Sequence, residues 1–382
     1  MNTSGKVMRI LFIIPNLKHG GAEIFLRRLT SALVGNIDIR VVVIGMREGL
    51  AKDFEKYGID VVYLELPTRY QFIRASREFR KIIRDFGPDV IQSLLYYADF
   101  IATLSAFPFN AKNLFWSFRG SSIPSGHSIL KRIALTFNVL ASWLLPIRII
   151  ACSEQVKNFH TRIGFPQKKI KVIPNFLADW VFSDSFSTSR ILTQEQPNFL
   201  KLGLAARFDP GKGHIDLVRA CIEVLSKQSS IQCIKLSFAG KGCEQGGRLS
   251  SQIELLALPI EKIEFEYLGI LDHDEMLPWY QAIDLYVMPS NGLEGFPNSL
   301  SEAVALGVPA IATDCGSAVD FVGIERVIHA PDINSIYEAL VRLIEEPLPL
   351  RISHSKKGIA HMRETYSVHE VIPQFLKAWS NG

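Results

Sequence analysis

Two glutamates, Glu294 and Glu302, lie in a pattern that suits the binding of a hydroxyl-rich ligand. They are separated by seven residues in the segment MPSNGLEGFPNSLSEAVALGVPAI, where a Gly-Phe-Pro-Asn loop leads into an expected helix. The first backbone N–H groups of a helix have no partner within the helix, and its positive end favours an anionic or hydroxyl-rich ligand. We therefore expect Glu294 to reach sugar hydroxyls from the loop, and Glu302, one turn into the helix, to reach a ribose diol.

The start of this helix also has a purely structural interpretation. We expect Asn298 or Ser299 to cap it, because a side-chain oxygen at that position accepts a hydrogen bond from a free N–H group. Ser299 and Glu302 have the spacing of a capping box, in which Glu302 would only stabilise the helix. Glu294 has no comparable structural explanation in the sequence.

Two cations precede these glutamates in the segment AARFDPGKGH. An expected strand ends at Arg207, and a Pro-Gly turn presents Lys212 before a helix that begins near His214. Two fixed cations at the end of a strand suit a diphosphate, because arginine binds oxygens with two donors and lysine acts as a point charge. The alternative is a surface turn whose charges are only solvated.

Two glycine-rich segments follow other expected strands. In FAGKGCEQGG, Gly240 would let the backbone approach a ligand closely, but the GxGxxG spacing is incomplete and a plain turn is favoured. In LKHGGAE, Gly20 and Gly21 stand between the first strand and a helix. Their backbone is expected to hold a phosphate or hydroxyl group.

Apolar strands that alternate with helices must position these residues. Continuous apolar runs separated by helical segments predict parallel sheets covered on both faces, here in two doubly wound α/β halves. Ligands of such sheets bind beyond the carboxyl ends of the strands, so a cleft between the halves is the expected site. The expected strands cover residues 8–16, 38–45, 61–66, 89–93, 114–117, 147–151, 199–206, 235–239, 263–267, 285–289 and 309–313.

Composition excludes several classes of protein. The net charge is +4 with no basic tract, which argues against a nucleic-acid binder. Five scattered cysteines without a CxxC pair indicate a reducing compartment and no zinc site. The N-terminal apolar run has no cleavage site of a signal peptide. The apolar stretch 133–150 is interrupted by polar residues and proline, so we expect a buried helix and a buried strand there.

The segments taken together resemble glycosyltransferase family 4 (glycosyl transferases group 1), a retaining family with the two-domain GT-B fold. The similar segments are HGGAE, SEQVKNFH, VIPN, RFDPGKGH, AGKG and EGFPNSLSEAVALGVP, in the order of the family, and they extend from Met8 to about Tyr366. The resemblance implies an α/β GT-B fold whose two Rossmann-like domains face each other across a cleft. The expected domains are 1–182 for the acceptor, a linker at 183–198, 199–366 for the nucleotide-sugar, and a C-terminal helix, 367–382, that packs back on the first domain.

The resemblance also implies roles for individual residues. Arg207 and Lys212 would contact the donor diphosphate, Glu302 the ribose, and Gly21 a phosphate from the other domain. The transferred sugar would contact Glu294 and the loop of Phe296, Pro297 and Asn298. Retention of configuration, a hexosyl donor and metal-independent transfer without a cofactor are implied in the same way, and a UDP-sugar is favoured because it is common in the family. The expected product is cell-surface polysaccharide or lipopolysaccharide.

The sequence Asp272-His273-Asp274 has the form of a metal-binding DxD motif. Glu275 lies three residues after Asp272, just inside a helical run, which is the arrangement of a helix N-cap. We therefore expect no metal site at this position.

The acceptor side departs from the family pattern. Where many relatives have a histidine, this chain has Arg119, which cannot act as a general base. Arg119 is expected either to bind a donor phosphate or a charged acceptor, or to pair with a nearby carboxylate. Tyr96, Tyr97 and Ser121 are acceptor candidates only because they follow expected strands.

Basic residues gather between positions 69 and 84 on an expected helix. They form either a surface for an anionic membrane that carries a lipid-linked acceptor, or a solvated helix face. The expected location is cytoplasmic, with peripheral contact to the inner face of the cell membrane. The cluster consists of Arg69, Arg74, Arg77, Arg80, Lys81 and Arg84.

Two other functions use the same donor residues. A non-hydrolysing nucleotide-sugar epimerase has a similar two-domain fold, and a sugar-nucleotide-binding protein without transfer activity would keep the same site. A dehydrogenase is less supported, because the dinucleotide fingerprint is incomplete.

Overall fold

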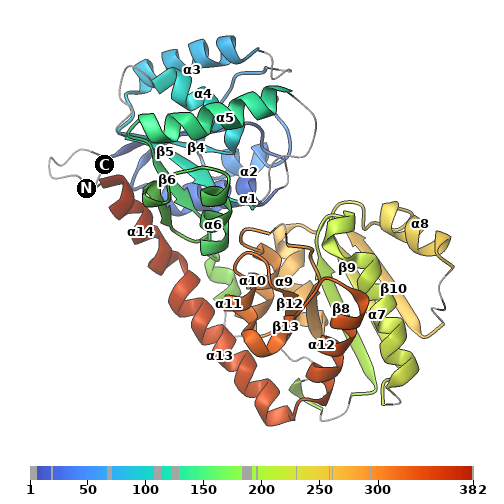
Figure 1. Ribbon diagram of the computed structural model, residues 1–382. Helices are drawn as coiled ribbons and strands as arrows, with labels where there is room; N and C mark the ends of the chain where they lie inside the picture. The colour runs from blue at the N-terminus through green and yellow to red at the C-terminus, as the bar shows by residue number, and fades with distance from the viewer. Residues whose placement is uncertain are drawn as a thin grey trace. The chain divides into compact units, whose positions relative to one another are not determined.

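The computed structural model describes residues 7–18, 20–66, 71–106, 113–121, 129–182, 192–194, 197–228, 230–257, 259, 261–292 and 294–380. The chain forms two compact units. The first contains Met1–Phe176 together with Val368–Gly382, and the second contains Leu177–Ser367 (Figure 1). Each is built from alternating strands and helices, as the sequence predicts.

The first unit has a seven-stranded parallel sheet in the order β3-β2-β1-β4-β5-β6-β7. Its strands are short apolar runs whose buried faces meet helices on both sides, so nearly every residue of β1 is buried. The strands are β1 (Arg9–Ile14), β2 (Asp38–Val43), β3 (Asp60–Tyr63), β4 (Val90–Leu94), β5 (Leu114–Phe118), β6 (Arg148–Ala151) and β7 (Ile170–Val172). The helices are α1 (Gly21–Leu33), α2 (Ala51–Lys56), α3 (Phe72–Phe86), α4 (Tyr96–Ala106), α5 (Ile129–Leu144), α6 (Glu154–Arg162) and α14 (Val368–Ser380).

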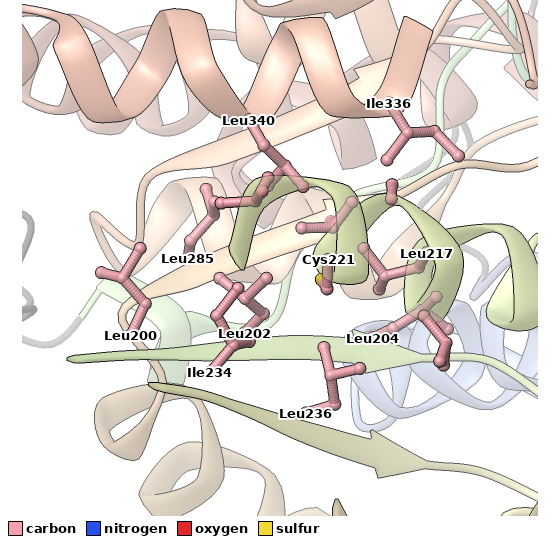
Figure 2. Close-up of a cluster of buried hydrophobic side chains, with 14 of the residues drawn as sticks. Leu200, Leu202, Leu204, Leu217, Cys221, Ile234, Leu236, Leu285, Ile336 and Leu340 are labelled. Atoms are coloured by element: carbon pink, nitrogen blue, oxygen red, sulfur yellow. The ribbon is translucent and has the colours of Figure 1, made fainter. Parts of the chain in front are cut away.

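The second unit has a six-stranded parallel sheet in the order β10-β9-β8-β11-β12-β13. The strands are β8 (Phe199–Ala205), β9 (Cys233–Ala239), β10 (Ile263–Gly269), β11 (Leu285–Met288), β12 (Ala310–Thr313) and β13 (Val327–Ile328). The helices are α7 (His214–Lys227), α8 (Arg248–Leu255), α9 (His273–Ala282), α10 (Asn298–Ala305), α11 (Ala318–Val322), α12 (Ile333–Glu345) and α13 (Leu348–Tyr366). Figure 2 shows part of the core, where Leu202 of β8 and Leu236 of β9 lie below Leu217 of α7 and Leu340 of α12.

Both sheets reverse their strand order next to the first strand of the unit. In the first unit β1 pairs with β2 on one side and with β4 on the other. In the second unit β8 pairs with β9 and with β11. Successive connections run in opposite directions from such a point, which leaves a crevice at the carboxyl ends of the two central strands.

The chain passes between the units at two neighbouring points. The backbone N–H of Leu177 donates to the carbonyl of Tyr366 at 2.8 Å, and Leu177 forms a parallel bridge with Ser367. The second unit therefore begins at Leu177, whereas the sequence placed residues up to 182 in the first domain. Most of the expected linker, residues 183–191 and 195–196, lies outside the described residues.

The C-terminal helix α14 belongs to the first unit. The ring of Phe375 lies 5.8 Å from that of Phe25 in α1, and Trp379 Nε1 donates to Gln92 Oε1 in β4 at 2.8 Å. Helix α5 is not buried as the sequence predicted, because its residues Leu140, Trp143 and Leu144 are exposed. Among the described residues, no helix combines the length and the apolar character that a membrane span needs.

Candidate active site

The strand order of the second unit brings the candidate donor-site residues to one edge of its sheet. Arg207 and Lys212 follow β8, Gly240 follows β9, and Glu294 follows β11. These three strands are direct neighbours, and all their carboxyl ends lie on the same edge because the sheet is parallel. The point of reversed order lies between β8 and β11, so the two cations and the glutamate flank the crevice described above.

The loops after β8 and β11 are held together by backbone contacts. The side chain of Asp209 accepts from the N–H of Gly211 at 3.0 Å, and the N–H of Asn291 donates to the carbonyl of Gly211 at 2.9 Å. Gly213 has a φ of +72°, and a Cβ atom there would lie 2.3 Å from the carbonyl oxygen of Pro289. Glycine is needed at this position for both reasons, and the close approach fixes Lys212 beside the second loop.

Lys212 and Glu294 form an ion pair across these two loops. Both side chains are largely buried, and the hydroxyl of Ser290 also donates to Glu294 Oε1 at 3.4 Å. Glu294 therefore has a structural partner that the sequence did not indicate. Arg207 is exposed, so the alternative of a solvated charge fits Arg207 but not Lys212.

Helix α10 begins without the side-chain cap that the sequence predicted. Its N-cap residue is Pro297, no side chain caps it, and neither Asn298 nor Ser299 serves as the cap. The hydroxyl of Ser299 instead donates to the carbonyl of Ala205 at 2.9 Å and accepts from the hydroxyl of Tyr286 at 2.7 Å. The predicted capping box of Ser299 with Glu302 is wrong, because tertiary partners from β8 and β11 take the serine hydroxyl.

Glu302 is buried one turn into α10. The hydroxyl of Tyr280 in α9 lies 2.9 Å from Glu302 Oε2 and 2.9 Å from the carbonyl oxygen of Ser299. The ring of Phe296 packs against those of Phe321 and Tyr366, with centroids 4.9 and 5.5 Å away. These contacts fix the orientation of both the glutamate and the loop that precedes it.

Gly240 has a local structural explanation. Its φ is +128°, and a Cβ atom would lie 2.3 Å from the carbonyl oxygen of Ala206, directly before Arg207. The glycine thus permits close packing of the loops after β8 and β9. This agrees with the plain turn that the sequence favoured, and it places the turn against the segment that carries Arg207.

In the first unit, Gly20 and Gly21 lie at the start of α1, after β1. Gly20 is the N-cap residue in an extended conformation and provides no side-chain cap, whereas His19 lies outside the described residues. Glu23 in the first turn is buried, and desolvation raises its pKa to about 7. Sequence reasoning did not single out Glu23, although it is the last letter of the HGGAE segment.

Arg119 follows β5 and has a mostly uncharged environment. Its Nε donates to Ser117 Oγ at 2.8 Å, its Nη1 donates to Asn175 Oδ1 at 2.9 Å, and its guanidinium lies 3.7 Å from the ring centroid of Phe25. The buried Nη2 atom has no hydrogen-bond partner, and among the described residues no carboxylate forms an ion pair with Arg119. Burial lowers the pKa of Arg119 to about 10, so the side chain stays charged at neutral pH. The predicted alternative of a carboxylate partner is therefore wrong.

The two acceptor-site tyrosines follow β4. The hydroxyl of Tyr96 lies 2.7 Å from His160 Nε2, and the His160 ring stacks on Phe118 with centroids 3.8 Å apart. Burial raises the pKa of Tyr96 and lowers that of His160 to about 4. The Tyr96 hydroxyl is thus held by a buried neutral histidine, whereas Tyr97 is partly exposed and Ser121 is buried.

The segment from Asp272 to Asp274 opens α9 as expected. Asp272 and Glu275 form a capping box, in which the backbone N–H of Asp272 donates to Glu275 Oε2 at 2.7 Å. The prediction of a helix N-cap is confirmed.

Two family models match this chain. The model described as "Glycosyltransferase Family 4" matches residues 19–178, and the model described as "Glycosyl transferases group 1" matches residues 200–346. The first range contains Gly20, Gly21 and Arg119, and the second contains all the candidate residues of the second unit.

Individual relatives are similar over parts of the sequence or over the fold. The chain is 31% identical over 104 residues to the lipopolysaccharide core biosynthesis mannosyltransferase LpsB of Rhizobium meliloti, covering 26% of this chain and 29% of that protein. It is 26% identical over 130 residues to a phosphatidyl-myo-inositol mannosyltransferase of Propionibacterium freudenreichii, covering 33% of this chain and 34% of the relative. The matches thus span about a third of these curated relatives.

The crystal structure of Anabaena HepE in complex with UDP-glucose has a TM-score of 0.78 with this chain, at 19% identity. The match covers 98% of this chain and all of that structure, so the two share the two-domain GT-B fold. Since the two family models together match most of the sequence, in the order of the two units, the chain belongs to the glycosyl transferases of group 1, family 4.

Proposed function

We propose that the chain is a retaining glycosyltransferase of the cytoplasm that moves a sugar, a hexose in particular, from a nucleotide-sugar to a glycan or lipid-linked acceptor. A UDP-sugar is the favoured donor, and cell-surface polysaccharide or lipopolysaccharide is the proposed product. The names of the two curated relatives support an acceptor of this kind, and the UDP-glucose complex of HepE supports a UDP-sugar. Because both curated relatives are mannosyltransferases, a mannose donor is the first alternative to test.

One observation carries this proposal. Arg207, Lys212 and the uncapped start of α10 lie at the carboxyl ends of two adjacent strands, where the strand order reverses. Two cations and free helix N–H groups favour a diphosphate. Glu294 on the adjoining loop and Glu302 within α10 then supply carboxylates for the hydroxyls of the sugar and the ribose.

The same groups suit the departure of a nucleoside diphosphate. When the bond between sugar and phosphate breaks, negative charge develops on the leaving phosphate and positive charge on the sugar ring. Arg207, Lys212 and the start of α10 would stabilise the leaving group without a divalent ion, because the fold already places them together at the carboxyl ends of β8 and β11. We propose that the acceptor attacks from the same face and that the leaving phosphate takes its proton, so the anomeric configuration is retained.

The Lys212–Glu294 ion pair is part of this mechanism. Without a ligand, Glu294 satisfies the lysine charge within the partly buried loop region. A bound diphosphate would compete with Glu294 for Lys212, and Glu294 would turn its second oxygen to a sugar hydroxyl. The pair thus keeps both side chains in place before the donor arrives.

The remaining candidates have supporting roles in the proposal. In the second unit, Gly240 lets the loop after β9 approach the diphosphate, and Ser299 anchors the start of α10 to β8. Phe296, Pro297 and Asn298 form the loop under the sugar. In the first unit, Gly20 and Gly21 would hold a phosphate, and Arg119 would bind an anionic group of donor or acceptor. Tyr96 and Tyr97, which are both partly exposed, would contact the acceptor.

The test is donor binding and hydrolysis by the purified protein with EDTA present, against UDP-, GDP- and ADP-sugars that include glucose and mannose. Tight binding or slow hydrolysis of one donor supports the proposal and identifies the nucleotide. Binding that requires added metal contradicts the metal-independent mechanism. An epimerised nucleotide-sugar in the absence of acceptor identifies an epimerase, and binding without hydrolysis or transfer to any acceptor identifies a binding protein.

A further inference from the structure

Helix α5 of the first unit exposes its largest apolar side chains to solvent. Ile133, Leu140, Trp143 and Leu144 are 53, 58, 63 and 82% exposed. They recur at intervals of seven, three and one residues, so they lie along one side of the helix. We call these four residues the α5 apolar stripe.

The other side of α5 contains small or polar residues. The buried positions are Ala134, Asn138, Ala141 and Ser142. Asn138 Nδ2 donates to the carbonyl of Tyr96 at the start of α4, at 2.8 Å. The helix thus packs on α4 through these short side chains and through the ring of Phe137, which lies 5.0 Å from that of Phe100. A surface helix ordinarily buries its large apolar side chains, but α5 leaves four of them exposed.

The neighbouring surface of the same unit is basic. Helix α3 contains five basic and two acidic residues, and four of the basic side chains are exposed: Arg74, Arg77, Lys81 and Arg84. Arg80 differs from them, because its Nη2 donates to the carbonyl of Leu104 in α4 at 2.8 Å. Arg69 lies outside the described residues. The predicted basic cluster therefore reduces to four exposed side chains, which we call the α3 basic face.

Helices α3, α4 and α5 lie side by side (Figure 1). A chain of aromatic contacts connects them, with ring centroids 5.8 Å apart for Phe72 and Phe100 and 5.0 Å apart for Phe100 and Phe137. The α3 basic face and the α5 apolar stripe are thus parts of one helical layer. Helix α5 adds Arg132, which is exposed, and contains no acidic residue.

Trp143 has the chemistry of a side chain at a membrane interface. Its Nε1 donates to the carbonyl of Gly164 at 2.8 Å, while most of its ring remains exposed. The polar atom is therefore satisfied within the protein, and the apolar ring is available for another surface. Tryptophan prefers this intermediate environment between water and hydrocarbon.

We propose that the α5 apolar stripe and the α3 basic face form a docking surface for an anionic lipid bilayer. The stripe would enter the boundary between headgroups and acyl chains, and the arginines and lysine would contact lipid phosphates. Charge complementarity favours a membrane over a second copy of this chain, because two basic faces repel each other. The inference extends the proposed function, on which it rests, by bringing a lipid-linked acceptor to the first unit.

The experiment is sedimentation of the full chain with vesicles of phosphatidylglycerol or of phosphatidylcholine. We expect binding to the anionic vesicles, weakened by salt. A Trp143→Ser, Leu144→Ser double variant should bind at least about tenfold more weakly, because it loses two large apolar side chains from the buried contact. The matched control is Leu255→Ser, since Leu255 is 85% exposed on α8 of the second unit.

A second pair of variants separates charge from apolar contact. Arg77→Glu changes the charge by two units, and one charge near an anionic surface is worth about fivefold, so binding to phosphatidylglycerol should weaken by more than about fivefold. Lys56→Glu on α2 is its control, because Lys56 is an exposed lysine of the same unit on another helix. Both charge variants should bind phosphatidylcholine vesicles as the unmodified chain does.

Three results would overturn the inference. The first is no binding of the unmodified chain to anionic vesicles, and the second is an equal loss of vesicle binding in the control variants. The third is a dimer in solution that dissociates when Trp143 and Leu144 are changed. The last result would assign the stripe to a second copy of the chain. Hydrolysis of the donor in vesicle-free solution is measured for every variant. A variant that hydrolyses the donor normally but no longer binds vesicles supports the docking surface. If the unmodified protein hydrolyses no donor, that result contradicts only the proposed function.

Discussion

Replacement of Lys212 by alanine is the most direct perturbation of the proposed donor site. Lys212 lies on the loop after β8 and forms an ion pair with Glu294 on the loop after β11. If the lysine stabilises the departing diphosphate, its loss should lower the rate of transfer much more than the stability of the fold. The backbone of the loop has its own support, because Asp209 and the close contact of Gly213 with Pro289 do not involve the lysine side chain.

The expected magnitude follows from two estimates. Two unit charges 4 Å apart interact by about 4 kcal/mol at an effective dielectric constant of 20. Removal of one preorganised donor to a developing oxyanion costs about 3–4 kcal/mol in comparable sites. Glu294 already compensates part of the lysine charge, so the effect should lie at or below the lower end of this range. We therefore expect kcat to fall about 100-fold, and at least about tenfold.

The assay measures kcat and KM with the donor identified by the binding panel, beside the thermal unfolding midpoint. Lys227→Ala is the control, since Lys227 is an exposed lysine near the other end of α7. Glu294→Ala should also lower transfer at least about tenfold, and the double variant should lose less than the product of the single effects, because paired residues are not additive. Near-normal transfer by both folded single variants would refute the site assignment.

Three further predictions concern residues around the site. Arg119→Leu should lower transfer at least about tenfold, because it removes the charge proposed to bind an anionic group, while the unfolding midpoint should change little, because relief of the buried unpartnered Nη2 offsets the two lost hydrogen bonds; a large loss of stability would instead indicate a structural role. Gly213→Ala should destabilise the protein by about 1–3 kcal/mol in urea unfolding, because of its positive φ and the contact with Pro289; an unchanged midpoint would contradict this. Partial burial opposes ionisation of Glu266, but hydrogen bonds from Lys201 and Ser237 lower its pKa to about 2. This stabilisation is present above the unfolded value near pH 4.5 and is lost as the pH falls toward 2, so Glu266→Gln should make urea stability less dependent on pH in that range, and an unchanged acid dependence would exclude this origin.

The fold was predictable because its signal is local and repeated. Each strand is a short apolar run, as in Leu200 to Leu204 of β8, and each run is followed by a helix or a turn rich in glycine. Parallel pairing follows from this alternation, and the position of ligands follows from parallel pairing. The two doubly wound halves predicted from these runs, and the GT-B fold implied by the family resemblance, are confirmed by the structure and by its similarity to HepE.

Contacts between residues distant in sequence were not predictable in the same way. The sequence placed Lys212 and Glu294 in one site, but it contained no sign that they pair with each other. It also left two alternatives for Arg119. Among the described residues the structure places Ser117, Asn175 and the ring of Phe25 around the guanidinium, and no carboxylate. These neighbours come from three separate segments of the first unit.

Local patterns were wrong where tertiary contacts offered stronger partners. Ser299 and Glu302 have the spacing of a capping box, but the N-cap residue is Pro297, two residues before Ser299, and the serine hydroxyl bonds to Ala205 and Tyr286. The apolar composition of the stretch 133–150 was equally misleading, because Ile133, Leu140, Trp143 and Leu144 of α5 are exposed. A helix of that kind is expected to be buried, unless another surface covers it in the cell.

The two wrong predictions, the capping box at Ser299 and the burial of α5, have different physical causes. At Ser299 the hydroxyl exchanges one hydrogen bond for two within the same unit, so the fold itself accounts for the departure from the local pattern. At Leu144 and Trp143 the fold compensates little of the exposure, because most of both apolar side chains remains in water and only Trp143 Nε1 has a hydrogen-bond partner, the carbonyl of Gly164. Exposed apolar surface of this size is typical of an interaction site. The exposure of the α5 apolar stripe therefore indicates that a surface outside this chain buries these side chains.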